Sequence, residues 1–311
     1  MAVSLSGVEL VADGNMEAAG VASWSQYGTN STFEKAAQDG SQALHIVNTT
    51  TQAGARQTVA PTAGLWYRLS GKLKSVSGTL WFKYETDAVG GFVVALQNIA
   101  PAAQTSYKGS GIFKGGPNHR IYISAFSGVT AEFYADDVSF QQIVNASMFS
   151  AQVDSGSSDV AEASVAVTCP STYEAPAGVA ICMNANDPSK YILGAVFRRV
   201  GYMNRVQVYS VDGTTVTQVY DGAITYVAGQ RVKLVKSGDT VNIFYNGVQI
   251  NPSGLNIPGF TGTIHGLFNT DNDNTLGAYT LPGPPVVGVT LFGKSIAQIF
   301  GKAVKQVGGK P

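Results

Sequence analysis

Short runs of alternating apolar and polar residues recur along most of the chain, separated by Gly, Asn, Asp and Pro. The alternation is clearest in "RIYIS" (residues 120–124) and "VQVY" (residues 206–209). A period of two with turn signals about every 8–12 residues predicts antiparallel β-sandwiches rather than helices. In "KLVKSGDTVNIFYNGVQI" the turns Ser237-Gly238-Asp239 and Asn246-Gly247 predict two consecutive hairpins, because Asn and Gly both tolerate positive φ.

The same pattern divides the chain into three parts. One run of strands ends with "FYADDVSFQQI", and "VNASMFSAQ" follows it. A second run extends to "AYTLPGPPVVG", whose prolines cannot lie in a central strand. We therefore expect domains at residues 1–145 and 146–282, each a sandwich, and a separate segment at 283–311.

The last segment, "KSIAQIFGKAVKQV", shows helical spacing instead. Ile296, Ile299, Phe300 and Val304 fall on one face, with lysines and glutamines away from it. Gly301 weakens such a helix by about 1 kcal/mol relative to Ala, so the helix needs a partner. We expect a short amphipathic attachment helix behind a Pro-rich hinge, or a helix that folds back on its own sandwich.

Composition excludes several classes of function. Charged residues are 13% of the chain, about half of the usual 25%, and the formal net charge is zero. No Lys/Arg run is present, so we expect no binding to nucleic acid through phosphates. No apolar stretch reaches the roughly 18 residues of a membrane span. The opening "MAVSLSGVELVADG" lacks the features of an export signal, so we expect synthesis in the cytoplasm without export.

Catalytic and zinc-binding constellations are also missing from the sequence. Cys169 and Cys182 are the only cysteines, too few for a zinc site, and either a disulfide or two buried thiols fits their spacing. His45, His119 and His265 are scattered and suggest no triad. We therefore predict a protein that is not an enzyme.

Residues 10–143 carry four landmarks in the order found in carbohydrate-binding modules of families 4, 9 and 22. "ADGNMEAAGVASWS" is similar to the opening Asn-Gly-x-Phe-Glu and Gly-Trp pair, and "AAQDGSQALHIVNT" to a Gly-x-x-Ala-Leu strand. "VAPTAGLWYRLSGKLK" is similar to a Pro-Gly-x-x-Tyr strand, and "FYADDVSF" to the closing Asp-Asp-Val-Ser strand. The opening, Asp13-Gly14-Asn15-Met16-Glu17, is shifted from the family pattern. The resemblance implies a jelly roll that binds sugars.

In that family the opening Glu and the closing Asp commonly share a structural calcium. Carried over by position, Glu17 and Asp136 or Asp137 would be its carboxylate ligands. The other interpretation is that one Asp caps a turn while its neighbour faces water.

Sugar contacts in such modules come from aromatic faces, and the candidates here are Trp66, Trp81 and Tyr84. In "LWFKY", Trp81 and Lys83 share one face of a strand while Phe82 and Tyr84 share the other. Only one of these faces can lie in the core, and the sequence leaves open which.

The second region, residues 148–281, resembles the concanavalin A-like (laminin G-type) jelly roll. The resemblance rests on "APAGVAICMNANDPSKYILGAVFR", on the hairpins named above and on "GTIHGLFNTDNDNTLGAYTL". No Glu follows Glu174, so the Glu-x-Asp-x-x-Glu pattern of glucanases on that fold is absent. The fold expected overall is all-β: two tandem antiparallel jelly-roll sandwiches followed by the short amphipathic helix.

A sugar-binding module without an export signal, low in charge and rich in Gly, Thr, Ser and Asn, suggests a bacteriophage virion protein released by host lysis. We predict a non-catalytic tail, fibre or capsid-decoration protein whose lectin-like domains bind cell-surface polysaccharide. Its expected partners are other virion proteins and further copies of itself, with a trimer as the guess from other phage fibres. Two alternatives stay open: secreted accessory modules of a glycoside hydrolase, and a virion scaffold that binds no sugar.

Overall fold

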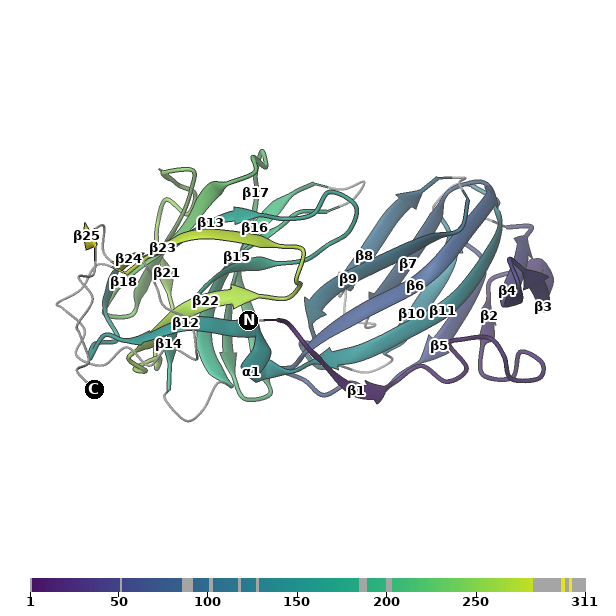
Figure 1. Ribbon diagram of the computed structural model, residues 1–311, viewed down its shortest axis with the longest axis horizontal. Helices are drawn as coiled ribbons and strands as arrows, with labels where there is room; N and C mark the ends of the chain where they lie inside the picture. Colours follow the sequence, from purple (N-terminus) through teal and green to yellow (C-terminus); the bar gives the residue numbers. More distant parts are fainter. Residues whose placement is uncertain are drawn as a thin grey trace, which may run out of the picture.

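The computed structural model describes residues 2–281, except for 51, 86–91, 101–102, 117–118, 127–128, 185–188 and 200–202, together with 298–299 and 302–303. These residues form two antiparallel β-sandwiches that lie end to end (Figure 1). The predicted all-β fold with tandem sandwiches is therefore confirmed. The chain passes from one sandwich to the other through a single helical turn, α1 (Asn145–Met148).

The first sandwich consists of two sheets, here called A and B. Sheet A has the order β3 (Asn30–Gln38), β4 (Ser41–Asn48), β11 (Glu132–Ile143), β6 (Trp66–Ser77), β9 (Thr105–Ile112), with β1 (Leu5–Glu9) also paired to β11. Sheet B has the order β2 (Ser25–Tyr27), β5 (Gly54–Thr58), β10 (Arg120–Ala125), β7 (Leu80–Glu85), β8 (Phe92–Ile99). Alternate residues of each sheet fill one shared apolar core.

The second sandwich consists of sheets C and D. Sheet C has the order β12 (Phe149–Asp154), β22 (Ile264–Asn269), β14 (Ala177–Met183), β15 (Lys190–Phe197), β16 (Arg205–Asp212), β17 (Thr215–Ala223). Sheet D has the order β20 (Val248–Gln249), β19 (Thr240–Tyr245), β18 (Gln230–Ser237), β13 (Val160–Thr168), β23 (Thr275–Thr280), with β21 (Leu255–Asn256) also paired to β19. The expected hairpins are β18–β19 and β19–β20, and Gly238, Asn246 and Gly247 all have positive φ.

The two adjacent aspartates of β11 lie at a β-bulge. Asp136 is buried, and its carboxylate accepts the N–H of Asp137 (2.7 Å) and the hydroxyl of Ser41 (2.8 Å). Asp137 is exposed, with a φ of 48°. The N–H of Val138 donates to the carbonyl of Gly14 (2.8 Å). The bulge thus ties the opening segment of the first sandwich to its closing strand.

Trp66, at the start of β6, lies where the two sandwiches meet. Its ring is fully buried, and its indole N–H donates to the hydroxyl of Tyr191 in sheet C (3.0 Å). The ring packs on Phe268, with 4.8 Å between ring centroids. Ile112 and Ile143 of the first sandwich belong to the same buried cluster. This junction covers the outer face of sheet C with apolar side chains from the end of the first sandwich.

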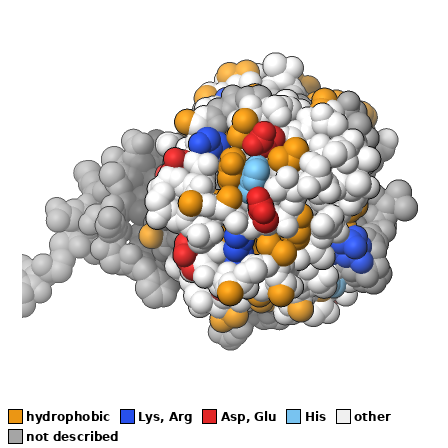
Figure 2. Space-filling model, turned by 90° about the vertical axis from the view of Figure 1, so that its right-hand side faces the viewer, with side chains coloured by type: hydrophobic (Ala, Val, Ile, Leu, Met, Phe, Trp, Pro, Cys, Tyr) orange, Lys and Arg blue, Asp and Glu red, His pale blue; other side chains and the backbone are white. Residues whose placement is uncertain are grey.

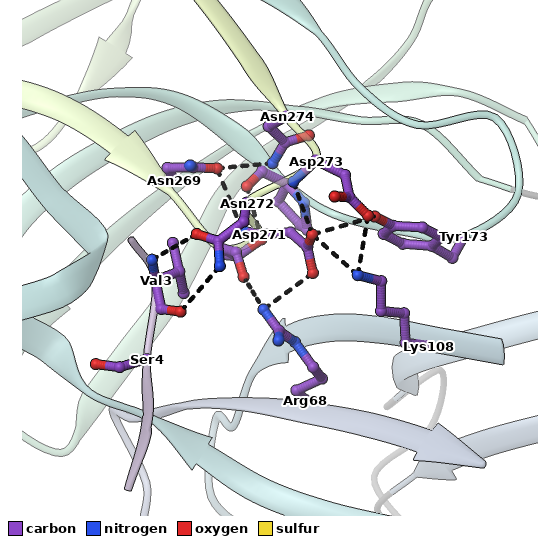
Figure 3. A network of polar contacts seen from close by, with 12 residues as sticks. Val3, Ser4, Arg68, Lys108, Tyr173, Asn269, Asp271, Asn272, Asp273 and Asn274 are labelled. Atoms are coloured by element: carbon purple, nitrogen blue, oxygen red, sulfur yellow. Dashed lines mark hydrogen bonds and ion pairs between the residues drawn. The ribbon is translucent and has the colours of Figure 1, made fainter. Parts of the chain in front are cut away.

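A polar network lies beside this apolar junction (Figure 3). The carboxylate of Asp271, 2% exposed, contacts Arg68 (2.9 Å) and Lys108 (3.1 Å), which both come from sheet A. Tyr173 of the second sandwich donates its hydroxyl to the same carboxylate (3.1 Å). Because basic groups on one sandwich meet acidic groups on the other, the two sandwiches are joined by charge as well as by apolar contact.

The predicted attachment helix falls mostly outside the described residues, as do Ile296, Phe300 and Val304 and the side chain of Ile299. The four described residues of that segment pair as β24 (Gln298–Ile299) and β25 (Lys302–Ala303). In the described part of the chain, no helix is long and apolar enough to cross a membrane. Seen from the end of the first sandwich, the surface carries few charged groups among uncharged atoms (Figure 2), in keeping with the composition.

Candidate functional site

The candidate site is the outer face of sheet B, the face that points away from the core. Phe82 and Tyr84 of β7 belong to the core, so the alternation of the strand places Trp81, Lys83 and Glu85 on the outer face. Pairing with β10 and β5 extends this face in three rows: Trp81–Ser124–Gly54, Lys83–Tyr122–Arg56 and Glu85–Arg120–Thr58.

One of these rows has aromatic rings at both ends and small residues between them. Tyr27 of β2 pairs with Gly54, so the row runs from Tyr27 through Gly54 and Ser124 to Trp81. A Cβ added to Gly54 would lie 2.1 Å from the carbonyl oxygen of Ile123, so the close approach of β10 requires glycine there. The row therefore combines two aromatic rings with a floor of little side-chain bulk.

The next row carries the charge. The ammonium of Lys83 lies 4.4 Å from the ring centroid of Trp81 and 5.0 Å from that of Tyr122, and 2.8 Å from the carboxylate of Glu85. Tyr27 meets Tyr122 edge to face, with 5.0 Å between centroids. These contacts fix the rings and the ammonium against one another, so the face is preorganised.

The middle of the outer face is buried although it lies on the side of the sheet that points away from the core. Ser124, Tyr122 and Lys83 are 1%, 3% and 5% exposed, whereas Trp81 and Tyr27 are only half-buried. The hydroxyl of Ser124 has no hydrogen-bond partner within the described residues. A buried hydroxyl without a partner is unfavourable, and a ligand oxygen would satisfy it.

The phenol of Tyr27 can act as a donor at this face. Burial, and after it the neighbouring Tyr122, raises the pKa of Tyr27 above its usual value. The hydroxyl therefore stays protonated at neutral pH and is available to donate a hydrogen bond.

Of the three aromatic residues expected to contact sugar, only Trp81 lies on this face. Tyr84 is fully buried and stacks on Phe140 with 4.5 Å between centroids, so its ring belongs to the core. Trp66 is fully buried in the junction between the sandwiches. We therefore correct the expectation for Trp66 and Tyr84: neither ring presents a face to a ligand in this structure.

The three carboxylates expected to hold calcium lie at the same end of sheet A but have other partners. Glu17 accepts the N–H of Gln42 (3.0 Å), next to the Ser41 that donates to Asp136. Asp137 lies 2.6 Å from the ammonium of Lys72. The described residues contain no group of three or more His, Cys, Asp or Glu that could hold a metal. As arranged here, these side chains do not fit a calcium shell, and calcium stays a prediction from the resemblance.

A cation of the chain itself lies in the opening loop. The ammonium of Lys35, from β3, contacts both the carboxylate of Asp13 and the carbonyl of Ala18. The side chains of Lys35 and Asp13 are 7% and 5% exposed. Asp13 also accepts the N–H of Ala18 (3.0 Å). A lysine therefore neutralises the acid at the opening of the sandwich.

A buried polar cluster around His265, in the described part of the second sandwich, resembles catalytic groups. His265 Nδ1 accepts the N–H of Cys182 (3.1 Å), so Nε2 carries the proton and faces the Ser157 carbonyl (3.0 Å) and the Ser155 hydroxyl (2.8 Å). Burial lowers the pKa of His265 to about 4. Because Nε2 is protonated, it cannot take a proton from Ser155. The cluster is structural.

Comparison with family models and with curated proteins finds no match. Among solved structures, the chain is similar to the CBM22-1 xylan-binding domain of Paenibacillus barcinonensis Xyn10C, at 18% identity and a TM-score of 0.36, over 46% of this chain and 96% of that one. A CBM4 structure matches at 14% identity and a TM-score of 0.36, over 42% of this chain and 99% of that one. The chain is similar in fold to carbohydrate-binding modules.

The CBM22-1–CBM22-2 tandem of P. barcinonensis Xyn10C matches at 11% identity and a TM-score of 0.38, over 89% of this chain and 97% of that one. All these likenesses concern the fold alone. The concanavalin A-like resemblance and the phage setting stay predictions.

The sequence did not identify Tyr27, Gly54, Tyr122 and Ser124 as site residues. Part of the signal was present, because "RIYIS" shows that Tyr122 and Ser124 share one face of their strand. Their proximity to Trp81 depends on the register of β10 against β7, which joins segments about forty residues apart. Nothing in the local pattern specifies that register.

Proposed function

We propose that the first sandwich binds a glycan chain on the outer face of sheet B and catalyses no reaction there. The proposal is carried by the row in which Tyr27 and Trp81 lie on either side of Gly54 and the buried hydroxyl of Ser124. Aromatic rings stack on the apolar faces of sugars, and recessed polar groups bond sugar hydroxyls.

The dimensions of the row favour a chain over a single sugar. Trp81 and Tyr27 lie on β7 and β2, three inter-strand steps apart. At about 4.8 Å per step the row spans about 14 Å, longer than one sugar ring. A polysaccharide crossing the strands would therefore meet both rings and the hydroxyl between them.

The acidic groups of this face support binding without cleavage. Glycoside hydrolysis ordinarily requires two carboxyl groups on either side of the scissile bond. Among the described residues of β2, β5, β7 and β10, Glu85 is the only acid, and it is paired with Lys83.

The test is binding to an array of plant, bacterial and algal polysaccharides, followed by titration of the best ligand. We expect Trp81→Ala to weaken the affinity by about tenfold or more, because loss of an aromatic platform costs about 1–3 kcal/mol. The matched control is Tyr134→Ala, which removes an aromatic ring stacked on His45 on the outer face of sheet A. Equal loss in both variants, or no binding by the intact protein, would contradict the proposal.

The setting that we propose is a bacteriophage particle, for which the support is a composition low in charge and rich in Gly, Thr, Ser and Asn. Mass spectrometry of purified particles from the source phage or prophage would detect the chain if this is right. Its absence from intact particles would favour a secreted accessory module instead. A chain that is present in particles but binds no polysaccharide would be a scaffold.

A further inference from the structure

Basic residues outnumber acidic ones on the described strands β2, β5, β7 and β10, which form the outer face of sheet B. The strands β2, β5, β7 and β10 carry the basic residues Arg56, Lys83 and Arg120 but a single acid, Glu85. The chain as a whole is neutral and poor in charge, so this excess is not a consequence of composition. The next acid in sequence, Asp87, lies outside the described residues.

The basic groups are placed beside the aromatic row. Arg56 and Lys83 lie on either side of Tyr122 in one row, and Arg120 occupies the row beyond it. Glu85 is 2.8 Å from Lys83 and therefore offsets its charge. The guanidinium of Arg56 lies 6.0 Å from the ring centroid of Tyr27, and no ion pair of Arg56 occurs among the described residues.

We propose that the glycan bound at this face carries carboxylate groups, as chains of uronic acids do. The inference rests on the proposed function and adds the chemical class of the ligand. A guanidinium donates two parallel N–H···O bonds to the two oxygens of a carboxylate. A single sugar hydroxyl has only one oxygen and cannot accept both bonds in this geometry. A sugar stacked on Tyr27 presents its substituents next to Arg56, so a carboxylate at that position is bound by charge while its ring is bound by stacking.

The experiment compares an acidic chain with its neutral counterpart on the same backbone. Calorimetric titrations would use oligogalacturonate and its methyl ester, mannuronan oligomers and their esters, and glucuronoxylan and unsubstituted xylan. We expect the acidic member of the preferred pair to bind about tenfold more tightly or better at low salt. This advantage should shrink when NaCl is raised from roughly 0.05 M to roughly 0.5 M, because salt screens partly exposed charges.

Two variants separate this inference from the proposed function. Arg56→Gln should remove the preference for the acidic chain and leave the affinity for its neutral counterpart within about twofold. Lys74→Gln, which changes a lysine near Tyr134 on the outer face of sheet A, should alter neither value. Equal binding of acidic and neutral chains, or tighter binding of neutral ones, overturns the inference and leaves the proposed function intact. Binding of no member of any pair overturns both.

Discussion

The buried carboxylate of Asp271 should contribute far more to stability than its exposed neighbour Asp273. Both contact Lys108 across the junction, and both accept the hydroxyl of Tyr173 (Figure 3). Asp271 is 2% exposed and also pairs with Arg68, whose side chain is 14% exposed. Asp273 is 60% exposed. The two residues thus share Lys108 and Tyr173, and they differ in burial and in the additional pair of Asp271 with Arg68.

The proposed changes are Asp271→Asn and Asp273→Asn, which keep the side-chain shape and remove the charge. Removing one partner of a buried ion pair costs about 3–5 kcal/mol, because the other charge stays buried. Arg68 keeps its bond to the Thr270 carbonyl (2.7 Å), so we expect the lower end, about 3 kcal/mol, for Asp271→Asn. An exposed ion pair contributes about 0–1 kcal/mol, which is the loss expected for Asp273→Asn.

The assay is equilibrium denaturation at pH 7, followed by tryptophan fluorescence, since Trp66 lies at the same junction. The loss of unfolding free energy in Asp271→Asn should persist at high salt, because buried ion pairs are screened less than exposed ones. If the two variants lose the same free energy within about 1 kcal/mol, the argument from burial at this junction is wrong.

Three further outcomes are expected. The pKa of His265 is lowered to about 4 from an ordinary 6.5, so the buried neutral imidazole contributes about 3 kcal/mol to the free energy of unfolding. This contribution is complete above pH 6.5 and is lost as the pH falls toward 4. A His265→Phe variant should therefore show a flatter dependence of stability on pH between these values. Lys35→Met should destabilise the first sandwich by about 3 kcal/mol, because it leaves the buried carboxylate of Asp13 without its cation. A chelator should leave the melting temperature of the unaltered protein unchanged, and a lower melting temperature would instead support the calcium prediction. Cys169 and Cys182 are free and buried, and burial raises the pKa of their thiols to about 12 and about 11, so a thiol reagent at pH 8 should label neither until the protein is unfolded.

The strands could be predicted because their signal is local. Period-two alternation and Asn-Gly turns depend on adjacent residues, and β10 and the β18–β19–β20 hairpins follow them directly. The presence of strands in two successive regions could be predicted for the same reason, because turn residues separate the runs of alternation. These features require no knowledge of which strands become neighbours.

The site depended on contacts that no local pattern contains. In "LWFKY" both faces of the strand carry an aromatic ring. The face with Tyr84 lies in the core, where Tyr84 stacks on Phe140 of β11. Trp66 resembled a sugar-binding ring because the surface that buries it belongs to the other sandwich. Lys35 is twenty-two residues from Asp13, so no local pattern predicted the ion pair between them.

The most direct measurement of the central claim is chemical-shift mapping of the intact chain during titration with its best polysaccharide ligand. Binding on the outer face of sheet B predicts the largest shifts at the Trp81 indole N–H and at the amides of Ser124 and Arg56, with sheets A and D unaffected. Shifts centred on another sheet, or none at saturating ligand, would contradict the assignment of this face as the binding site.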